Sequence, residues 1–129
     1  MSEKAPFDPT RIKYGFTRKI DTACGSLYIT INSDDNDKPY EIFISLGKSG
    51  GCMNAMSESL GRLVSLALQN GVDIEKIHKS LYKIRCPSPW NVGSKNQVLS
   101  CIDAVSIGIK MFLEDKGVKV EVKEKEIVR

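Results

Sequence analysis

The chain has 129 residues, of which 41% are hydrophobic and 27% are charged, and these values are typical of one globular domain. The net charge of +3 and the pI near 8.7 are too weakly basic to favour a nucleic-acid partner. No apolar run approaches the roughly 18 residues of a membrane span, and the start "MSEKAPFDPTR" lacks the apolar core of a secretory signal. We therefore expect a cytoplasmic protein with no membrane partner.

The first part of the chain predicts strands. Residues 1–11 are polar with two prolines and predict a flexible N-terminal arm. Residues 15–20 can form a short strand, and residues 25–33 alternate between apolar and polar side chains as a half-buried strand does. Residues 40–46 are rich in β-branched and aromatic residues, and the acidic turn 34–39 before them completes a predicted antiparallel hairpin.

The apolar period changes to that of helices after a glycine-rich turn. A helix is predicted over residues 52–69, and its apolar residues should form one buried stripe: Met53, Met56, Leu60, Leu63, Val64, Ala67 and Leu68. Asp73 is a suitable N-cap for a second helix over residues 74–83. A third helix is predicted over residues 97–114.

This order of elements predicts an α+β domain over residues 12–117, because the strands come first and the helices follow. About three helices should pack on one face of a small antiparallel sheet. Residues 118–129 alternate like an edge strand, but their charge is equally typical of a solvated tail. An exposed edge strand could also complete a homodimer or a higher oligomer.

The turn Gly-Lys-Ser-Gly-Gly, residues 47–51, joins the third predicted strand to the first helix. It is not a Walker loop, because Ile42 stands where that motif has its first glycine. Backbone N–H groups at the start of a helix have no internal partner and favour an anion. The turn therefore supplies candidate phosphate ligands: Lys48, Ser49, Gly50 and Gly51. The alternative is that the glycines only allow a tight strand-to-helix turn.

The proline-bracketed loop 85–96 carries the only tryptophan, Trp90. Trp90 is either a core anchor or a stacking platform for a base, with Arg85 and Lys95 nearby for phosphates. These residues favour a stand-alone protein that binds a nucleotide or another phosphate-bearing small molecule. Sequestration of a cyclic or dinucleotide signal is one form of that function. The only histidine, His78, is expected on the solvated surface of the second helix.

The four cysteines fall near the expected ends of elements and contain no CxxC pair: Cys24, Cys52, Cys86 and Cys101. If their thiolates met at one edge of the domain, they would hold zinc or an iron–sulfur cluster. The alternatives are small buried apolar side chains, which the place of Cys101 on an apolar helix face favours, or a thiol–disulfide pair. Arg85 beside Cys86 would also suit an activated nucleophile in an enzyme acting alone.

Four phrases that occur in one order, over about residues 13–114, resemble the TSCPD-type domain: "DTACGSLYITIN", "LGKSGGCMNAMSESLGRLVSLALQNGVD", "IRCPSPW" and "VLSCIDAVSIGI". That domain occurs at the C-terminus of adenosylcobalamin-dependent ribonucleotide reductases and in small separate proteins. Of the Thr-Ser-Cys-Pro-Asp motif the chain keeps Ser100, Cys101 and Asp103, with Ile102 in place of proline. The resemblance implies a non-catalytic accessory module that acts with a larger nucleotide-metabolism enzyme. Cobalamin and radical chemistry do not carry over, because the chain is too short for the catalytic barrel.

Overall fold

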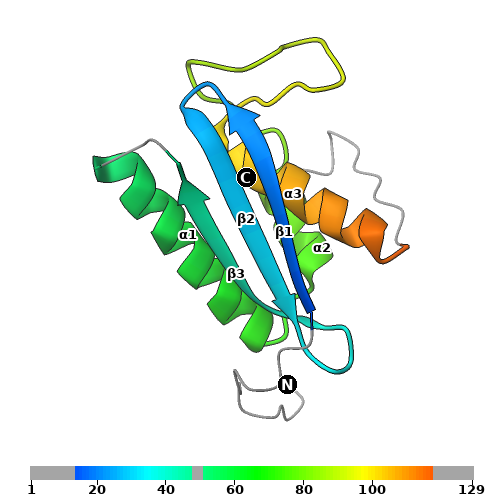
Figure 1. Ribbon diagram of the computed structural model, residues 1–129. Helices are drawn as coiled ribbons and strands as arrows, with labels where there is room; N and C mark the ends of the chain where they lie inside the picture. The colour runs from blue at the N-terminus through cyan, green and yellow to red at the C-terminus, as the bar shows by residue number, and fades with distance from the viewer. Residues whose placement is uncertain (1–13, 48–50, 118–129) are drawn as a thin grey trace.

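A computed structural model describes residues 14–47 and 51–117, which form a sheet with helices packed behind it (Figure 1). The strands β1 (Tyr14–Thr22), β2 (Gly25–Ser33) and β3 (Pro39–Leu46) make an antiparallel sheet in the order β1-β2-β3. The helices α1 (Gly51–Gln69), α2 (Ile74–Leu81) and α3 (Cys101–Asp115) follow. The predicted α+β class with a small antiparallel sheet is confirmed. The arm 1–11 and the edge strand or tail 118–129 lie outside the described residues.

The sheet is a meander of two hairpins, and the sequence predicted only the second of them. The strand expected over residues 15–20 is longer, because it pairs with β2 along its whole length, from Tyr14 opposite Ser33 to Thr22 opposite Gly25. The predicted hairpin of β2 and β3 is present, with a register shift at its acidic turn. The turn between β1 and β2 therefore lies at one end of the sheet and the acidic turn at the other (Figure 1).

One face of the sheet forms the core. Leu27, Ile29 and Ile31 alternate along β2 and are fully buried, as their spacing of two residues requires. Helix α3 packs on β1 and β2, whereas α1 packs on β3. The opposite face carries exposed side chains such as Thr17 and Phe43. Within the described ranges, no helix has the length and apolar character needed to cross a membrane.

Helix α1 turns a different face to the sheet from the predicted apolar stripe. Met53, Met56 and Leu63 were expected inside, but they are 38%, 62% and 64% exposed. Leu60 and Ala67 are partly buried, and the buried residues of the helix are Ser57, Gly61, Val64 and Leu68. The prediction is therefore wrong for Met53, Met56 and Leu63 and right for Val64 and Leu68.

The cause of this rotation is close packing of α1 against the edge strand β3. A Cβ atom on Gly61 would lie 3.2 Å from the carbonyl oxygen of Ile42, so only glycine fits there without displacement. The Ser65 hydroxyl accepts the Ile42 backbone N–H at 2.9 Å and lies 3.2 Å from the Ile42 carbonyl oxygen, to which it can donate. The small and polar face of α1 thus pairs the backbone of an edge strand that would otherwise stay exposed.

Helices α2 and α3 are shorter than predicted. Helix α2 ends at Leu81 rather than at residue 83. Asp73 is its N-cap residue, as predicted, although its side chain makes no cap hydrogen bond. Helix α3 begins at Cys101 rather than at residue 97, because Ser100 is its N-cap and its side chain accepts the Asp103 backbone N–H at 2.9 Å. The segment between the two helices is therefore longer than the sequence suggested.

We expect Gly108→Ala to lower the free energy of unfolding by about 1–3 kcal/mol, although alanine is the better helix former. The added Cβ would lie 2.6 Å from Cγ2 and 3.0 Å from Cδ1 of the fully buried Ile29, so α3 would have to move away from β2. Urea unfolding followed by circular dichroism measures the change. The control is Asn54→Ala on the exposed side of α1, which should be neutral or slightly stabilising. Equal stability of Gly108→Ala and the wild type would contradict this close packing.

Candidate functional site

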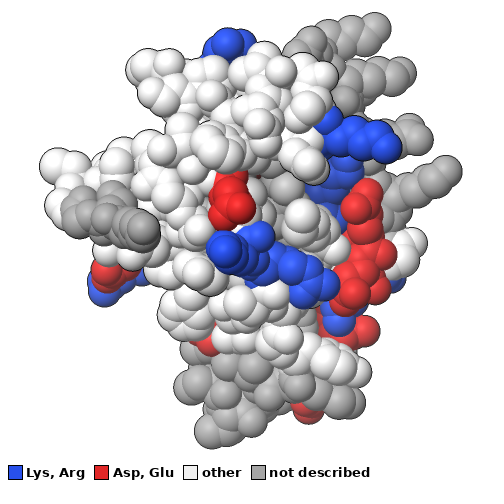
Figure 2. Space-filling view, turned by 45° about the horizontal axis from the view of Figure 1, so that its top comes forward, with Lys and Arg blue, Asp and Glu red and all other residues white. Residues whose placement is uncertain are grey.

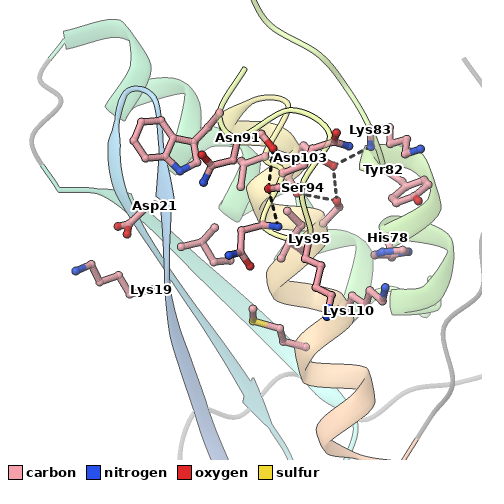
Figure 3. A pocket seen from close by; sticks show the side chains of 18 residues that line it. Lys19, Asp21, His78, Tyr82, Lys83, Asn91, Ser94, Lys95, Asp103 and Lys110 are labelled. Carbon is pink, nitrogen blue, oxygen red and sulfur yellow. Dashed lines mark hydrogen bonds between the residues drawn. The ribbon is translucent and has the colours of Figure 1, made fainter. Parts of the chain in front are cut away.

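A pocket of about 590 Å³ opens between β1, α2, α3 and the segment that joins the two helices. That segment, residues 82–100, lies at the same end of the sheet as the turn between β1 and β2 (Figure 1). The volume of the pocket is in the range of small-molecule sites. Figure 3 shows that the labelled side chains of the pocket come from β1, α2, α3 and the connecting loop.

The buried carboxylate of Asp103 holds the ends of the connecting loop in place. Its Oδ1 accepts the backbone N–H of Lys83 at 2.9 Å, and its Oδ2 accepts that of Leu99 at 3.0 Å. The Ser106 hydroxyl lies 3.1 Å from the same Oδ1. Lys83 has a φ of 60°, a left-handed backbone conformation that such a fixed contact helps to maintain. Asp103 therefore has a structural role at the pocket wall.

The loop is closed by a pair of backbone hydrogen bonds that fix Trp90 above the pocket. The Trp90 N–H donates to the Val98 carbonyl at 2.7 Å, and the Val98 N–H donates back to Trp90 at 2.8 Å. The Trp90 side chain lines the pocket and remains 41% exposed. Of the two predicted roles for Trp90, this exposure favours a platform over a core anchor.

The charged side chains of the pocket are mainly basic. Four lysines and two aspartates line it: Lys19, Lys83, Lys95, Lys110, Asp21 and Asp103. The negative charge of Asp103 also reaches His78, so the two aspartates offset part of the charge of the four lysines. In Figure 3, Lys110 lies on the side of the pocket where His78 lies, and its charge acts on the imidazole. On the face that Figure 2 draws, basic side chains lie in short groups beside acidic ones.

His78 is the unexpected residue of the pocket. It is 1% exposed, and neither ring nitrogen has a hydrogen-bond partner among the described residues. Its ring stacks at a tilt on Tyr82, with 5.5 Å between the centroids. Burial and the positive charge of Lys110 lower the pKa of His78 below its ordinary value; Asp103 raises this pKa and Lys79 lowers it further. The imidazole is therefore neutral near pH 7 and keeps an unused donor and acceptor.

The predicted binding residues divide into three groups. Trp90 and Lys95 line the pocket, whereas Arg85 is exposed and outside its lining. Three residues of the glycine turn, 48–50, lie outside the described residues. Gly51 is described: it has a φ of 62° and begins α1, which packs on β3. The pocket thus unites only part of the predicted set, and it adds residues that sequence reasoning missed.

The missed residues are His78, Lys83 and Lys110. The prediction that His78 is solvated is wrong, because the helix buries it together with Ile74 and Ile77. Its spacing held the signal, since His78 follows Ile74 by four residues and so shares the apolar face of a helix. For Lys83 and Lys110, which lie in different elements, no local pattern in the sequence indicated that both would reach one pocket.

Three of the four cysteines of the predicted metal site lie near one another. Cys101 is buried, Cys86 is half-buried and Cys24 is exposed, and both neighbours lie close enough to influence the Cys101 thiol. Cys52 lies in the first turn of α1, which packs on β3 rather than beside α3. In the parts of the chain that the structure describes, no group of three or more His, Cys, Asp or Glu side chains is arranged to hold a metal ion. The zinc or iron–sulfur site remains a prediction without structural support.

A comparison with protein-family profiles matches the chain to the TSCPD domain over residues 3–113. Comparisons with curated proteins and with solved structures found no significant match. The matched range covers the described sheet, the pocket and nearly all of α3. It also includes Asp103, which the structure shows to anchor the loop. The chain therefore belongs to the TSCPD domain family and is a small accessory domain of the ribonucleotide reductase kind.

Proposed function

We propose that this accessory domain binds a nucleotide in the pocket between β1, α2, α3 and the connecting loop. The observation that carries the proposal is His78, a buried imidazole with two unpartnered nitrogens in a pocket whose charged residues are mainly lysines. A buried polar group without a hydrogen bond costs about 1–3 kcal/mol, so a ligand that pairs it recovers this cost. An anionic oxygen is the partner that both His78 and the neighbouring lysines favour.

The phosphate end of the ligand belongs near Lys95, Lys110 and His78. Neither Lys95 nor Lys110 has an acidic partner within salt-bridge distance in the described part of the chain. Their flexible stems let both ammonium groups move to a phosphate oxygen. Neutral His78 can donate one N–H, and a bound anion raises its pKa so that both nitrogens can donate.

The base end of the ligand belongs at Trp90. A partly exposed indole on a loop fixed by backbone hydrogen bonds offers a flat apolar surface, and stacking a base on such a ring contributes about 1–3 kcal/mol. Asn91 and Asn96 line the same pocket and bring side-chain amides that can pair with the edge of a base. A nucleotide satisfies both ends, whereas inorganic phosphate satisfies only one.

In this proposal the domain binds nucleotide for a larger nucleotide-metabolism enzyme rather than transforming it. The accessory character of the family supports that role. Tyr82 stacks on His78, and Lys110, Asp103 and Lys79 act on it electrostatically, so its surroundings suit the holding of an anion.

Lys110→Ala should weaken the binding of ADP by roughly 10- to 100-fold, because a hydrogen bond to a charged group contributes about 1.5–3 kcal/mol. Isothermal titration calorimetry with AMP, ADP, ATP, adenosine and inorganic phosphate measures the affinities. Trp90→Ala should weaken nucleotide binding but leave phosphate binding unchanged. The control is Lys76→Ala on the exposed side of α2, outside the pocket lining, which should bind as the wild type does. The proposal fails if no phosphate compound binds, or if Lys110→Ala and Lys76→Ala bind equally.

A further inference from the structure

A second cluster of reactive groups lies outside the pocket, where the turn between β1 and β2 meets the first turn of α3. The Thr22 hydroxyl joins the two segments: it accepts the Cys24 backbone N–H at 3.1 Å and lies 3.7 Å from the Cys101 Sγ. Thr22 is itself buried and donates to the Gly25 carbonyl at 2.8 Å, so it is fixed within the turn. The contacts of Thr22 place Cys24 and Cys101 against each other although they belong to opposite parts of the chain.

We propose that Cys24 and Cys101 form a redox-active thiol pair that low-molecular-weight disulfides oxidise to an intramolecular disulfide. One thiol is exposed and the other is 5% exposed, which is the arrangement of an attacking cysteine with a protected partner. The proposal is independent of nucleotide binding, since neither cysteine lines the pocket.

The electrostatics of the cluster agree with this assignment. Burial raises the pKa of the Cys101 thiol; the Thr22 hydrogen bond opposes the rise, and Cys24 and Cys86 add to it. The charged neighbours in that effect are the two other thiols, and Cys24 acts on Cys101 both as a hydrogen-bond partner and as a charge. Cys101 is therefore a protonated, protected thiol near pH 7, and the exposed Cys24 is the group that meets a reagent first.

The reaction is a thiol–disulfide exchange in two steps. The Cys24 thiolate attacks one sulfur of a small disulfide such as oxidised glutathione, forming a mixed disulfide and releasing one glutathione thiolate. The Cys101 thiolate then attacks the Cys24 sulfur, and the second glutathione leaves as a thiolate that takes up a proton. The two protein thiols lose two protons and two electrons, and the small disulfide gains both to become two thiols.

Cys86 is the competing partner and requires a separate control. Its Sγ accepts the Ser88 backbone N–H at 3.3 Å, and its own N–H donates to the Leu99 carbonyl at 3.0 Å. These contacts hold Cys86 in the connecting loop, whereas the shared Thr22 hydroxyl ties Cys24 to Cys101. The geometry therefore favours Cys101 as the partner of Cys24, with Cys86 as the alternative to be excluded.

The test treats the reduced full chain with oxidised glutathione at pH 8, blocks free thiols with N-ethylmaleimide, and determines intact and peptide masses. We expect the number of blocked thiols to fall from four to two, with a cross-linked peptide pair that contains Cys24 and Cys101. Cys24→Ser and Cys101→Ser should abolish the cross-link, whereas Cys86→Ser and the matched control Cys52→Ser should retain it. Circular dichroism checks that each variant is folded. If Cys101→Ser does not fold, Cys24→Ser still tests the proposal, because Cys24 is exposed and its substitution should leave the fold intact.

Three outcomes would overturn the proposal: four blocked thiols, a stable glutathione adduct on Cys24, or a cross-link between Cys24 and Cys86. A second measurement examines the role of the protected thiol. Because burial raises the pKa of Cys101, closure of the mixed disulfide should accelerate as the pH rises from 8 to 9.5. A closure rate that is constant over this range would contradict Cys101 as the second nucleophile.

Discussion

Asp103→Ala is expected to lower the free energy of unfolding by about 3–5 kcal/mol, because it removes the shared acceptor of the loop that lines the pocket. The substitution leaves the backbone N–H groups of Lys83 and Leu99 without their partner, and Leu99 is a buried residue. It also removes the acceptor at 3.1 Å from the Ser106 hydroxyl. Urea unfolding followed by far-ultraviolet circular dichroism measures the loss, and Trp90 fluorescence reports the loop at the same time.

Asp21→Ala is the matched control, since Asp21 also lines the pocket but is exposed. Its carboxylate accepts a hydrogen bond from Ser26 at 2.9 Å, and its removal should change stability by no more than about 0.5 kcal/mol. Asp103→Asn should fall between the two, because the amide keeps one oxygen but turns a donor toward one former donor. A loss below about 1 kcal/mol for Asp103→Ala would show that the carboxylate does not hold the loop.

The sheet was largely predictable because its signals are local. Alternation along residues 25–33 assigns Leu27, Ile29 and Ile31 to one face, and the structure buries all three. The length of β1 was not predictable in the same way. Its register depends on pairing with β2 from end to end, and pairing is a property of two segments rather than one.

Hydrophobicity could not predict which face of α1 is buried, because the close approach of its backbone to that of β3 determines this face. Gly61 and Ser65 face the edge of β3. Gly61 lets the two backbones approach closely, and the Ser65 hydroxyl hydrogen-bonds to the backbone of Ile42, which a methionine or leucine side chain could not do. Met56 and Leu63 are left on the exposed side as a result. A period of 3.6 residues specifies which residues share a face, but it does not specify which face meets a strand edge.

The candidate site was predicted in part because its residues come from distant segments. Trp90 and Lys95 share one loop and were grouped by proximity in the sequence, whereas Lys110 enters the pocket from α3. The cysteines show the same limit: convergence at one end of the domain followed from element ends, but the separation of Cys52 depends on α1 packing on β3. Side-chain chemistry was visible in the sequence, and the assembly of those groups in space was not.

Acidification is expected to destabilise the wild-type protein through His78. The pKa of His78 in the folded state is lowered by burial and by Lys110, so below the unfolded value of about 6.5 the unfolded chain binds a proton that the folded chain refuses. Stability is therefore fully present above this value and is lost as the pH falls below it, at up to about 1.4 kcal/mol per pH unit. Urea unfolding between pH 7.5 and 5.5 measures the slope, and His78→Leu should show a smaller one.

Sulfate should reverse part of this loss, and this reversal connects the buried histidine to anion binding. An anion held by Lys110 and Lys95 offsets the repulsion that disfavours the imidazolium, so sulfate binding and protonation of His78 should strengthen each other. Sulfate is the suitable probe because its charge is constant over this range, whereas a phosphate monoester titrates near pH 6. Calorimetry should show tighter sulfate binding at pH 5.5 than at 7.5, by up to about tenfold per pH unit for one coupled proton.

The variant His78→Leu separates coupling at this residue from a general rise in positive charge at low pH. It keeps Lys95 and Lys110 and removes only the titrating ring, so it should bind sulfate with nearly the same affinity at both pH values. If the variant retains the pH dependence of the wild type, the proton is taken up elsewhere and His78 is only a buried ring packed on Tyr82. If the dependence disappears with the imidazole, His78 is the group whose protonation is coupled to anion binding.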